Sequence, residues 1–117
     1  MLPALRFAYG LCHALTAACL ERVGGGEALG LFVAGECVHS VYRPPHSPAF
    51  LDGFGLTEGP DALGRCAARF VRVGEGFEWR RLDEAELRSL VAGANRPRLR
   101  VLIGKAMPVA RELLALA

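Results

Sequence analysis

Three residues with reactive side chains occur in an order that could support covalent catalysis: Cys12, His39 and Asp52. A cysteine is an effective nucleophile once it ionises, and a neighbouring imidazolium favours the thiolate. A carboxylate on the far side of the imidazole fixes its orientation and its tautomer. We therefore interpret Cys12 as a candidate nucleophile, His39 as its general base and then acid, and Asp52 as the group that orients His39.

These three side chains need elements that bring them together. Apolar residues recur at helical spacing from 10 to 23, and the three glycines 24–26 end this pattern, so we predict a helix with Cys12 in its first turn. The N-terminal end of a helix favours negative charge, which suits a thiolate. Alternating apolar residues predict antiparallel strands at 28–33 and 37–42, followed by a short strand at 49–52.

The faces of the second strand matter for the site. Regular alternation would place Cys37, His39 and Val41 on one face, and we expect that face to point at the helix that carries Cys12. Only a short proline-rich loop joins the strands that carry His39 and Asp52. If these strands pair, the two side chains become neighbours.

The remaining sequence predicts further helices. Gly59-Pro60-Asp61 opens a second helix, and its apolar face contains Leu63, Ala67 and Phe70. Residues 70–73 and 77–82 predict a hairpin around two glycines.

A third helix begins at Asp83, where Asp83 and Glu86 have the spacing of a capping box, and it ends near Gly93. Residues 99–103 fit either a buried strand or a helix, and 107–116 predict a C-terminal helix with Pro108 near its start. The expected fold class is α+β, with helices mainly on one side of an antiparallel sheet.

Composition limits the classes of protein. The 117 residues are 52% hydrophobic and 22% charged, which predicts one folded domain over residues 1–117. The net charge of +2 is small and interspersed, so we expect no nucleic-acid partner. No apolar run is long enough for a bilayer, and Arg6 and His13 interrupt the N-terminal apolar stretch, so we expect no membrane span and no signal peptide. The expected location is the cytoplasm.

The four cysteines form no C-x-x-C pair, which weakens zinc and thioredoxin interpretations. In a reducing cytoplasm they are expected as free thiols, and Cys19, Cys37 and Cys66 fit a role as core residues. The sequence predicts no cofactor and no resident metal, and it does not indicate an oligomeric state.

The order helix-cysteine, strand-histidine, strand-aspartate over roughly residues 9–55 resembles the minimal core of papain-like and transglutaminase-like cysteine hydrolases, which include the NlpC/P60 group. Three segments are also similar to those of small uncharacterised bacterial and phage proteins: Gly10-Leu11-Cys12-His13, Val38-His39-Ser40 and Leu51-Asp52-Gly53-Phe54-Gly55. The resemblance implies a nucleophile at the start of a helix that packs on an antiparallel sheet. It also implies hydrolysis or acyl transfer at an amide, ester or isopeptide bond, with a peptide or another amide-containing molecule as substrate.

One feature departs from that family. Papain-like peptidases usually place a glutamine shortly before the cysteine to help form the oxyanion hole, and this chain contains no glutamine. We expect the backbone N–H of Cys12 to donate instead, with support from Tyr9 and Gly10.

Simpler interpretations exist for each residue. Cys12 could be a buried structural thiol, His39 a core histidine with satisfied hydrogen bonds, and Asp52 a turn former. A zinc site built from Cys12, His13, Cys37 and His39 is a second chemical interpretation.

Two other histidines are weaker candidates. His13 follows Cys12 directly and is expected to point away from it, because adjacent helical residues diverge. His46, in the proline-rich loop, is the alternative base. The competing class of protein is a non-catalytic interaction module on the same fold, such as a phage accessory protein or an antagonist of host defence, with a protein as its partner.

Overall fold

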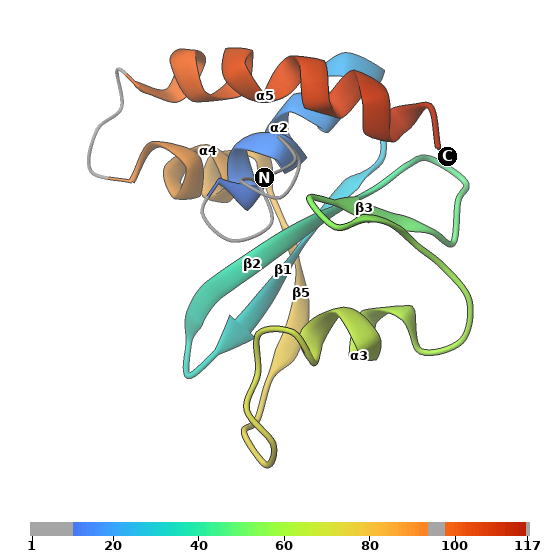
Figure 1. Ribbon diagram of the computed structural model, residues 1–117. Helices are drawn as coiled ribbons and strands as arrows, with labels where there is room; N and C mark the ends of the chain where they lie inside the picture. Colours follow the sequence, from blue (N-terminus) through green and yellow to red (C-terminus); the bar gives the residue numbers. More distant parts are fainter. Residues whose placement is uncertain (1–10, 94–97, 117) are drawn as a thin grey trace.

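The computed structural model describes residues 11–93 and 98–116. The elements in chain order are α2 (Cys12–Val23), β1 (Glu27–Val33), β2 (Glu36–Arg43), β3 (Phe50–Asp52), β4 (Gly55–Thr57), α3 (Ala62–Ala67), β5 (Glu78–Leu82), α4 (Glu84–Ala92) and α5 (Leu99–Leu114). The five strands form one antiparallel sheet in the order β4-β3-β2-β1-β5 (Figure 1). The predicted α+β class is confirmed, as is the packing of the N-terminal helix on the sheet.

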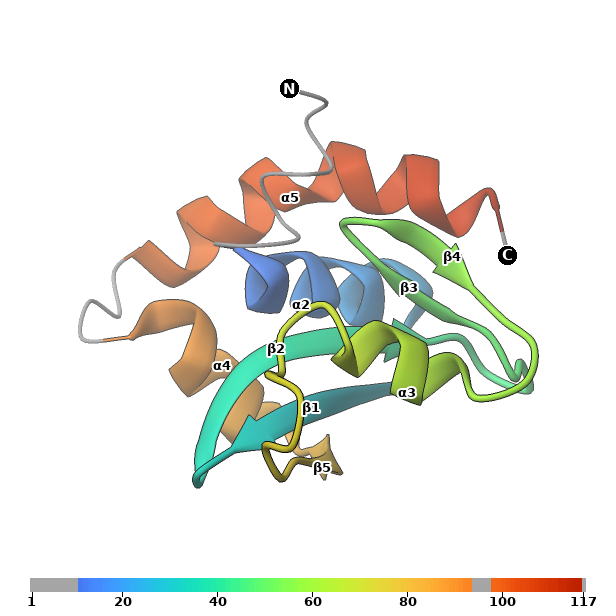
Figure 2. The same cartoon turned by 60° about the horizontal axis from the view of Figure 1, so that its bottom comes forward.

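The helices lie on both faces of the sheet but unequally. Helices α2, α4 and α5 cover one side, and the short helix α3 lies on the other (Figures 1 and 2). Helix α2 is the central element, since it packs against α5 and against β2. The indole N–H of Trp79 on β5 donates to the carbonyl of Leu63 at 3.2 Å and ties α3 to the opposite face.

The local signals explain why α2 begins and ends where it does. Its inward stripe includes Leu15, Ala18 and Cys19, which are all buried. Gly24 adopts a left-handed conformation with φ 76°, and its N–H donates to the carbonyl of Leu20 at 2.8 Å. Glycine takes this conformation without a Cβ penalty, so the helix ends at the predicted place.

We expect Leu15→Ala to lower the free energy of unfolding by about 2–5 kcal/mol, because its side chain is 2% exposed in the main hydrophobic core. Leu20→Ala on the same helix is the matched control, since Leu20 is only partly buried and should cost less. Chemical denaturation measures both values. Equal losses would show that the two leucines contribute alike and would contradict this assignment of the core.

Two elements on the far side of the sheet differ from the predictions. The predicted hairpin is wrong: residues 70–73 form turns, and β5 pairs instead with β1, with Ala28 opposite Leu82. Pairing with β1 gives β5 a ladder of five residue pairs, which is longer than the four residues 70–73 could form. Helix α3 ends at Ala67, so Phe70 lies beyond it and is half-buried, as is Leu63.

The third and fourth helices follow their local signals in part. The predicted capping box of α4 is confirmed, because the Asp83 carboxylate accepts from the N–H of Glu86 at 2.7 Å. The C-terminal region is one helix, α5, with Pro108 in its interior rather than near its start. Pro108 and Gly104, one turn before it, both lie on the exposed side, where water can satisfy the carbonyl of Gly104 that loses its helical partner.

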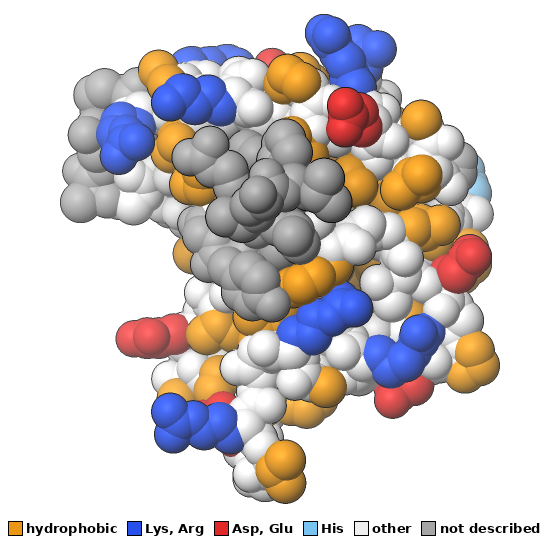
Figure 3. Space-filling model, viewed as in Figure 1, with side chains coloured by type: hydrophobic (Ala, Val, Ile, Leu, Met, Phe, Trp, Pro, Cys, Tyr) orange, Lys and Arg blue, Asp and Glu red, His pale blue; other side chains and the backbone are white. Residues whose placement is uncertain are grey.

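Charged side chains are interspersed on the face shown in Figure 3, and blue and red groups alternate with uncharged surface. Within residues 11–93 and 98–116, no helix has the length and apolar character required to cross a bilayer.

Candidate active site

His39 lies at an irregular point of β2. The pairing with β1 places Leu31 opposite His39 but Phe32 opposite Cys37, which leaves Val38 outside the paired register as a β-bulge. Consecutive residues of β1 point to opposite faces, and cross-strand partners share a face. Cys37 and His39 therefore lie on opposite faces, and the prediction that they share one is wrong.

The face of β2 that packs on α2 is also not the predicted one. Ser40 is fully buried, and its hydroxyl lies 3.0 Å from the hydroxyl of Thr16 on α2. His39 belongs to the opposite face, where its ring stacks on Phe70 with centroids 4.1 Å apart and an interplanar angle of 20°. The bulge at Val38 interrupts the alternation of side chains between the two faces of β2. As a result, Ser40 rather than His39 lies on the face that packs against α2.

His39 can still interact with α2 because of where it lies along the strand. Strand β3 pairs with β2 only at Tyr42 and Leu51, so the outer edge of β2 beside His39 is unpaired within the described chain. A side chain at an open edge can be contacted from both layers. Phe70 contacts the His39 ring from the side of α3, and Cys12 interacts with it from the side of α2.

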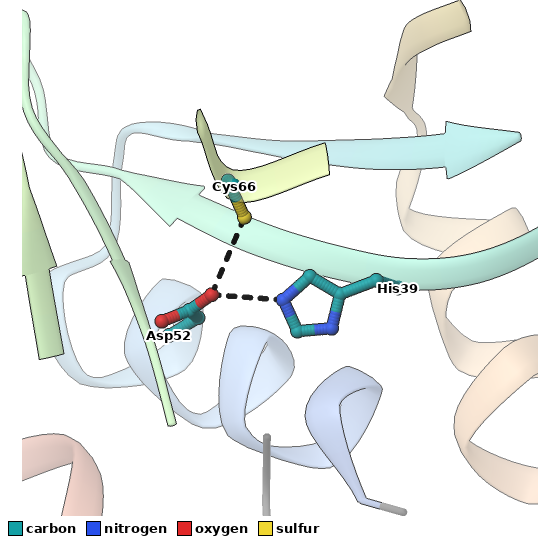
Figure 4. Close-up of side chains that lie close together, drawn as sticks. All are labelled: His39, Asp52 and Cys66. Atoms are coloured by element: carbon teal, nitrogen blue, oxygen red, sulfur yellow. Dashed lines mark hydrogen bonds and ion pairs between the residues drawn. The ribbon is translucent and has the colours of Figure 1, made fainter. Parts of the chain in front are cut away.

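The imidazole of His39 and the carboxylate of Asp52 form the closest pair of the site. His39 Nε2 lies 2.8 Å from Asp52 Oδ2, and the two side chains are 0% and 4% exposed (Figure 4). The other carboxylate oxygen accepts from the N–H of Phe54 at 2.9 Å in the turn after β3. An ionised carboxylate only accepts, so His39 donates from Nε2 and its Nδ1 is the free acceptor in the neutral ring. The predicted proximity of His39 and Asp52 is observed.

Cys12 begins α2, as predicted, and is 6% exposed. Burial by itself opposes ionisation of the thiol, but interactions with the side chains of His13 and His39 outweigh it and lower the pKa of Cys12 to about 6. Burial likewise opposes the charged form of His39, but its hydrogen bond to Asp52 and its interaction with Cys12 raise the pKa of its imidazole well above the ordinary range. Both shifts favour a thiolate on Cys12 paired with an imidazolium on His39.

The contact between Cys12 and His39 is looser than that between His39 and Asp52. His39 Nδ1 is buried and has no hydrogen bond of standard geometry within the described chain. Cysteine–histidine contacts are often long in sites without substrate and tighten when it binds. The structure thus pairs His39 directly with Asp52, and the interaction of His39 with Cys12 is the one that lowers the pKa of the thiol.

The expectation that His13 points away from Cys12 is wrong. Its Nδ1 lies 2.8 Å from the hydroxyl of Ser40, and its side chain contributes to the low pKa of the Cys12 thiol. The alternative base, His46, is exposed in the loop between β2 and β3. The sequence does show that His13 follows Cys12 directly. The orientation of the His13 ring, however, depends on the packing of α2 against Ser40 on β2.

Cys66 and Phe70 contact the candidate site, and no signal in the sequence predicted these contacts. The predicted burial of Cys66 is correct, but its thiol also donates to Asp52 Oδ2 at 3.6 Å (Figure 4). The ring of Phe70 stacks on His39. Both residues hold the imidazole–carboxylate pair from the side of α3. Since their segment docks on the sheet face opposite α2, no periodicity in the sequence indicates that they meet His39.

The support residues predicted for the oxyanion, Tyr9 and Gly10, lie outside the described residues. The backbone N–H of Cys12 remains as a donor, because it is among the first N–H groups of α2 and these have no acceptor within the helix.

Side chains of His39, Asp52 and Cys66 have ligand atoms within 4.8 Å of one another, which is close enough for a metal ion. Their nitrogen, oxygen and sulfur donors are types that zinc accepts. They are, however, already hydrogen-bonded to each other, and we interpret them as a positioning network. The zinc set considered from sequence included Cys37, whose thiol instead donates to the carbonyl of His39 at 3.3 Å.

A cavity of about 690 Å³ lies elsewhere in the described chain. It is at the C-terminal end of α2, bordered by residues such as Leu20 and Arg100. Cys12 is at the opposite end of the same helix, so this cavity is not the entrance to the triad. Comparisons with models of protein families, with curated proteins and with solved structures found no match to this chain.

Proposed function

We propose that this protein is a cysteine-dependent hydrolase or acyl-transferase that acts on an amide, ester or isopeptide bond. The observation that carries the proposal is the place of Cys12 at the start of α2 beside two imidazoles, which lower the pKa of its thiol to about 6 although burial opposes the charge. Two neighbouring imidazoles stabilise a thiolate, whereas a buried structural cysteine is stable as the neutral thiol. The other described cysteines illustrate the contrast, since burial raises the pKa of Cys19 to about 12 and that of Cys37 to about 11.

The chemistry follows from the roles of the three side chains. The Cys12 thiol gives its proton to His39, and the thiolate attacks the acyl carbon of the substrate. Asp52 stabilises the resulting imidazolium and keeps Nε2–H directed at itself, so that Nδ1 serves the thiol. The leaving group departs with a proton from an imidazole beside Cys12, and water or an amine then takes the acyl group from sulfur while losing a proton to that imidazole. The negative oxygen of the tetrahedral intermediate would be bound at the start of α2.

The order of elements supports the papain-like interpretation, with the nucleophile at the start of a helix that packs on an antiparallel sheet. The cytoplasmic location stays a proposal, for which the four free thiols are the supporting observation. A peptide or another amide-containing molecule remains the proposed substrate.

A specific observation favours the second candidate, a non-catalytic interaction module. Cys12, His39 and Asp52 are 6%, 0% and 4% exposed, and none of them borders the cavity of about 690 Å³. A module of this kind would keep the network for stability and bind a protein partner through its surface.

An acylation assay separates the two candidates. Incubation with p-nitrophenyl acetate should add one acetyl group to Cys12, located by mass spectrometry of peptides, because the thiolate attacks the ester and nitrophenolate leaves. Cys12→Ala should abolish this adduct, whereas Cys37→Ala, which removes a half-buried thiol of high pKa, should not. Absence of both acetyl-Cys12 and steady release of nitrophenolate in the wild-type protein would favour the interaction module.

A further inference from the structure

His39 is poorly placed to exchange protons with a substrate. Its side chain is fully buried, and its position between Phe70 and the Asp52 carboxylate keeps it charged and enclosed. A hydrolase must nevertheless protonate the leaving group and deprotonate the attacking water. The second imidazole beside Cys12, that of His13, is only half-buried and is thus more accessible than His39.

A chain of hydrogen bonds fixes the tautomer of His13. The hydroxyl of Thr16 lies 3.1 Å from the carbonyl of Cys12, and a carbonyl only accepts, so Thr16 uses its single proton there. The hydroxyl of Ser40, 3.0 Å from that of Thr16, must then donate to Thr16. Ser40 has no second proton, so it accepts from His13 at 2.8 Å, and His13 Nδ1 carries the hydrogen.

The consequence concerns the other ring nitrogen. Ser40 and Thr16 are 0% and 2% exposed, so water does not compete for these bonds. With Nδ1–H committed to Ser40, the Nε2 atom of a neutral His13 carries a free lone pair. This is the atom that can take up and release a proton, and the hydroxyl chain returns to the carbonyl of the nucleophile itself.

We propose that His13 is a second catalytic residue, the acid and base that exchanges protons with the substrate through Nε2, while His39 and Asp52 hold the thiolate. This inference rests on the proposed function. Within it, the inference assigns to His13 the proton exchange with substrate, for which the buried His39 is poorly placed. It also gives a role to the buried polar pair Thr16 and Ser40.

The proton balance is complete. The Cys12 thiolate forms the thioester bond as the bond from the acyl carbon to the leaving group breaks, and His13 Nε2–H gives its proton to the leaving atom. Water then attacks the thioester and loses a proton to the neutral His13, and the carbon–sulfur bond breaks to restore the thiolate. His13 is again protonated, and the imidazolium of His39 is unchanged throughout.

The test uses His13→Asn in the full chain. The Asn amide N–H can replace Nδ1–H toward Ser40, but the variant lacks the second nitrogen. With p-nitrophenyl acetate, nitrophenolate leaves without a proton, so the initial burst of about one nitrophenolate per protein should remain. Steady-state turnover should fall about 10²- to 10⁴-fold, the usual contribution of a positioned acid or base, and acetyl-Cys12 should accumulate. His46→Asn, the same change at an exposed histidine, should leave burst and turnover unchanged.

The outcomes distinguish this inference from the proposed function. Turnover at the wild-type rate in His13→Asn would overturn the role of His13 and leave the hydrolase proposal standing. Absence of a burst in the wild-type protein would overturn both. Nitrogen-15 NMR of the imidazoles adds a readout independent of activity: neutral His13 should carry its proton on Nδ1, and Ser40→Ala should remove this preference. A wild-type His13 protonated at Nε2 would also contradict the inference.

Discussion

Iodoacetamide at pH 7 is expected to alkylate Cys12 about 30- to 100-fold faster than Cys37. The Cys12 pKa of about 6 makes it mostly thiolate, whereas the Cys37 pKa of about 11 leaves roughly one part in 10⁴ ionised. The thiolate fractions of the two cysteines therefore differ by about 10⁴. The thiolate of lower pKa is also the weaker nucleophile, by about 0.4–0.5 log units per pKa unit, and this offsets about two of the four powers of ten. Timed quenching and mass spectrometry of peptides would measure the two rates.

Cys37 is the stringent reference because it is half-buried, while Cys12 is 6% exposed. Access therefore favours Cys37, and a faster reaction at Cys12 must come from ionisation. In guanidinium chloride the difference should collapse to a few-fold, because unfolding separates His39 from Cys12 and exposes both thiols to water. Faster labelling of Cys37 in the native protein would identify Cys12 as an inert core thiol.

The second large effect is expected from His39→Gln. In the wild-type protein the alkylation rate should rise with pH through about 6 and then level off, since the thiolate forms above the pKa of Cys12. Without the imidazolium, thiolate formation needs a higher pH, so the inflection should move upward by about 1–3 units, the usual effect of one neighbouring charge. Iodoacetamide does not titrate in this range, so the inflection reports the thiol.

Glutamine is chosen because its amide N–H can still donate to Asp52 and so preserve the partner of a buried carboxylate. His46→Gln removes an exposed imidazole and should leave the inflection unchanged. Asp52→Asn should shift it less than His39→Gln, because the imidazole remains. An unchanged inflection in His39→Gln would show that His39 does not activate Cys12, and the triad proposal would then fail.

Local signals in the sequence determined several elements. The helical stripe before Gly24, the alternating strands β1 and β2, and the pair Asp83 and Glu86 are each set by residues a few positions apart. Periodicity and capping act over such short distances, so they can be predicted without knowledge of the partner segments. The pairing of His39 with Asp52 was also predictable, because a short loop joins their strands and limits how far apart they can lie.

Tertiary packing decided the rest of the site. The bulge at Val38 depends on the register between β1 and β2, and it reverses the face that a simple alternation assigns to Cys37. The sequence cannot show a register irregularity, because either face of β2 contains residues that can be buried.

The same holds for segments that dock from far along the chain. Cys66 and Phe70 reach the site only because α3 covers the face opposite α2. The apolar stripe of α5 keeps Pro108 inside a continuous helix against its local preference. The candidate triad could be predicted from residue types and their order along the chain. The contacts of His13, Cys66 and Phe70 around it could not, since they depend on which faces of distant segments bury together.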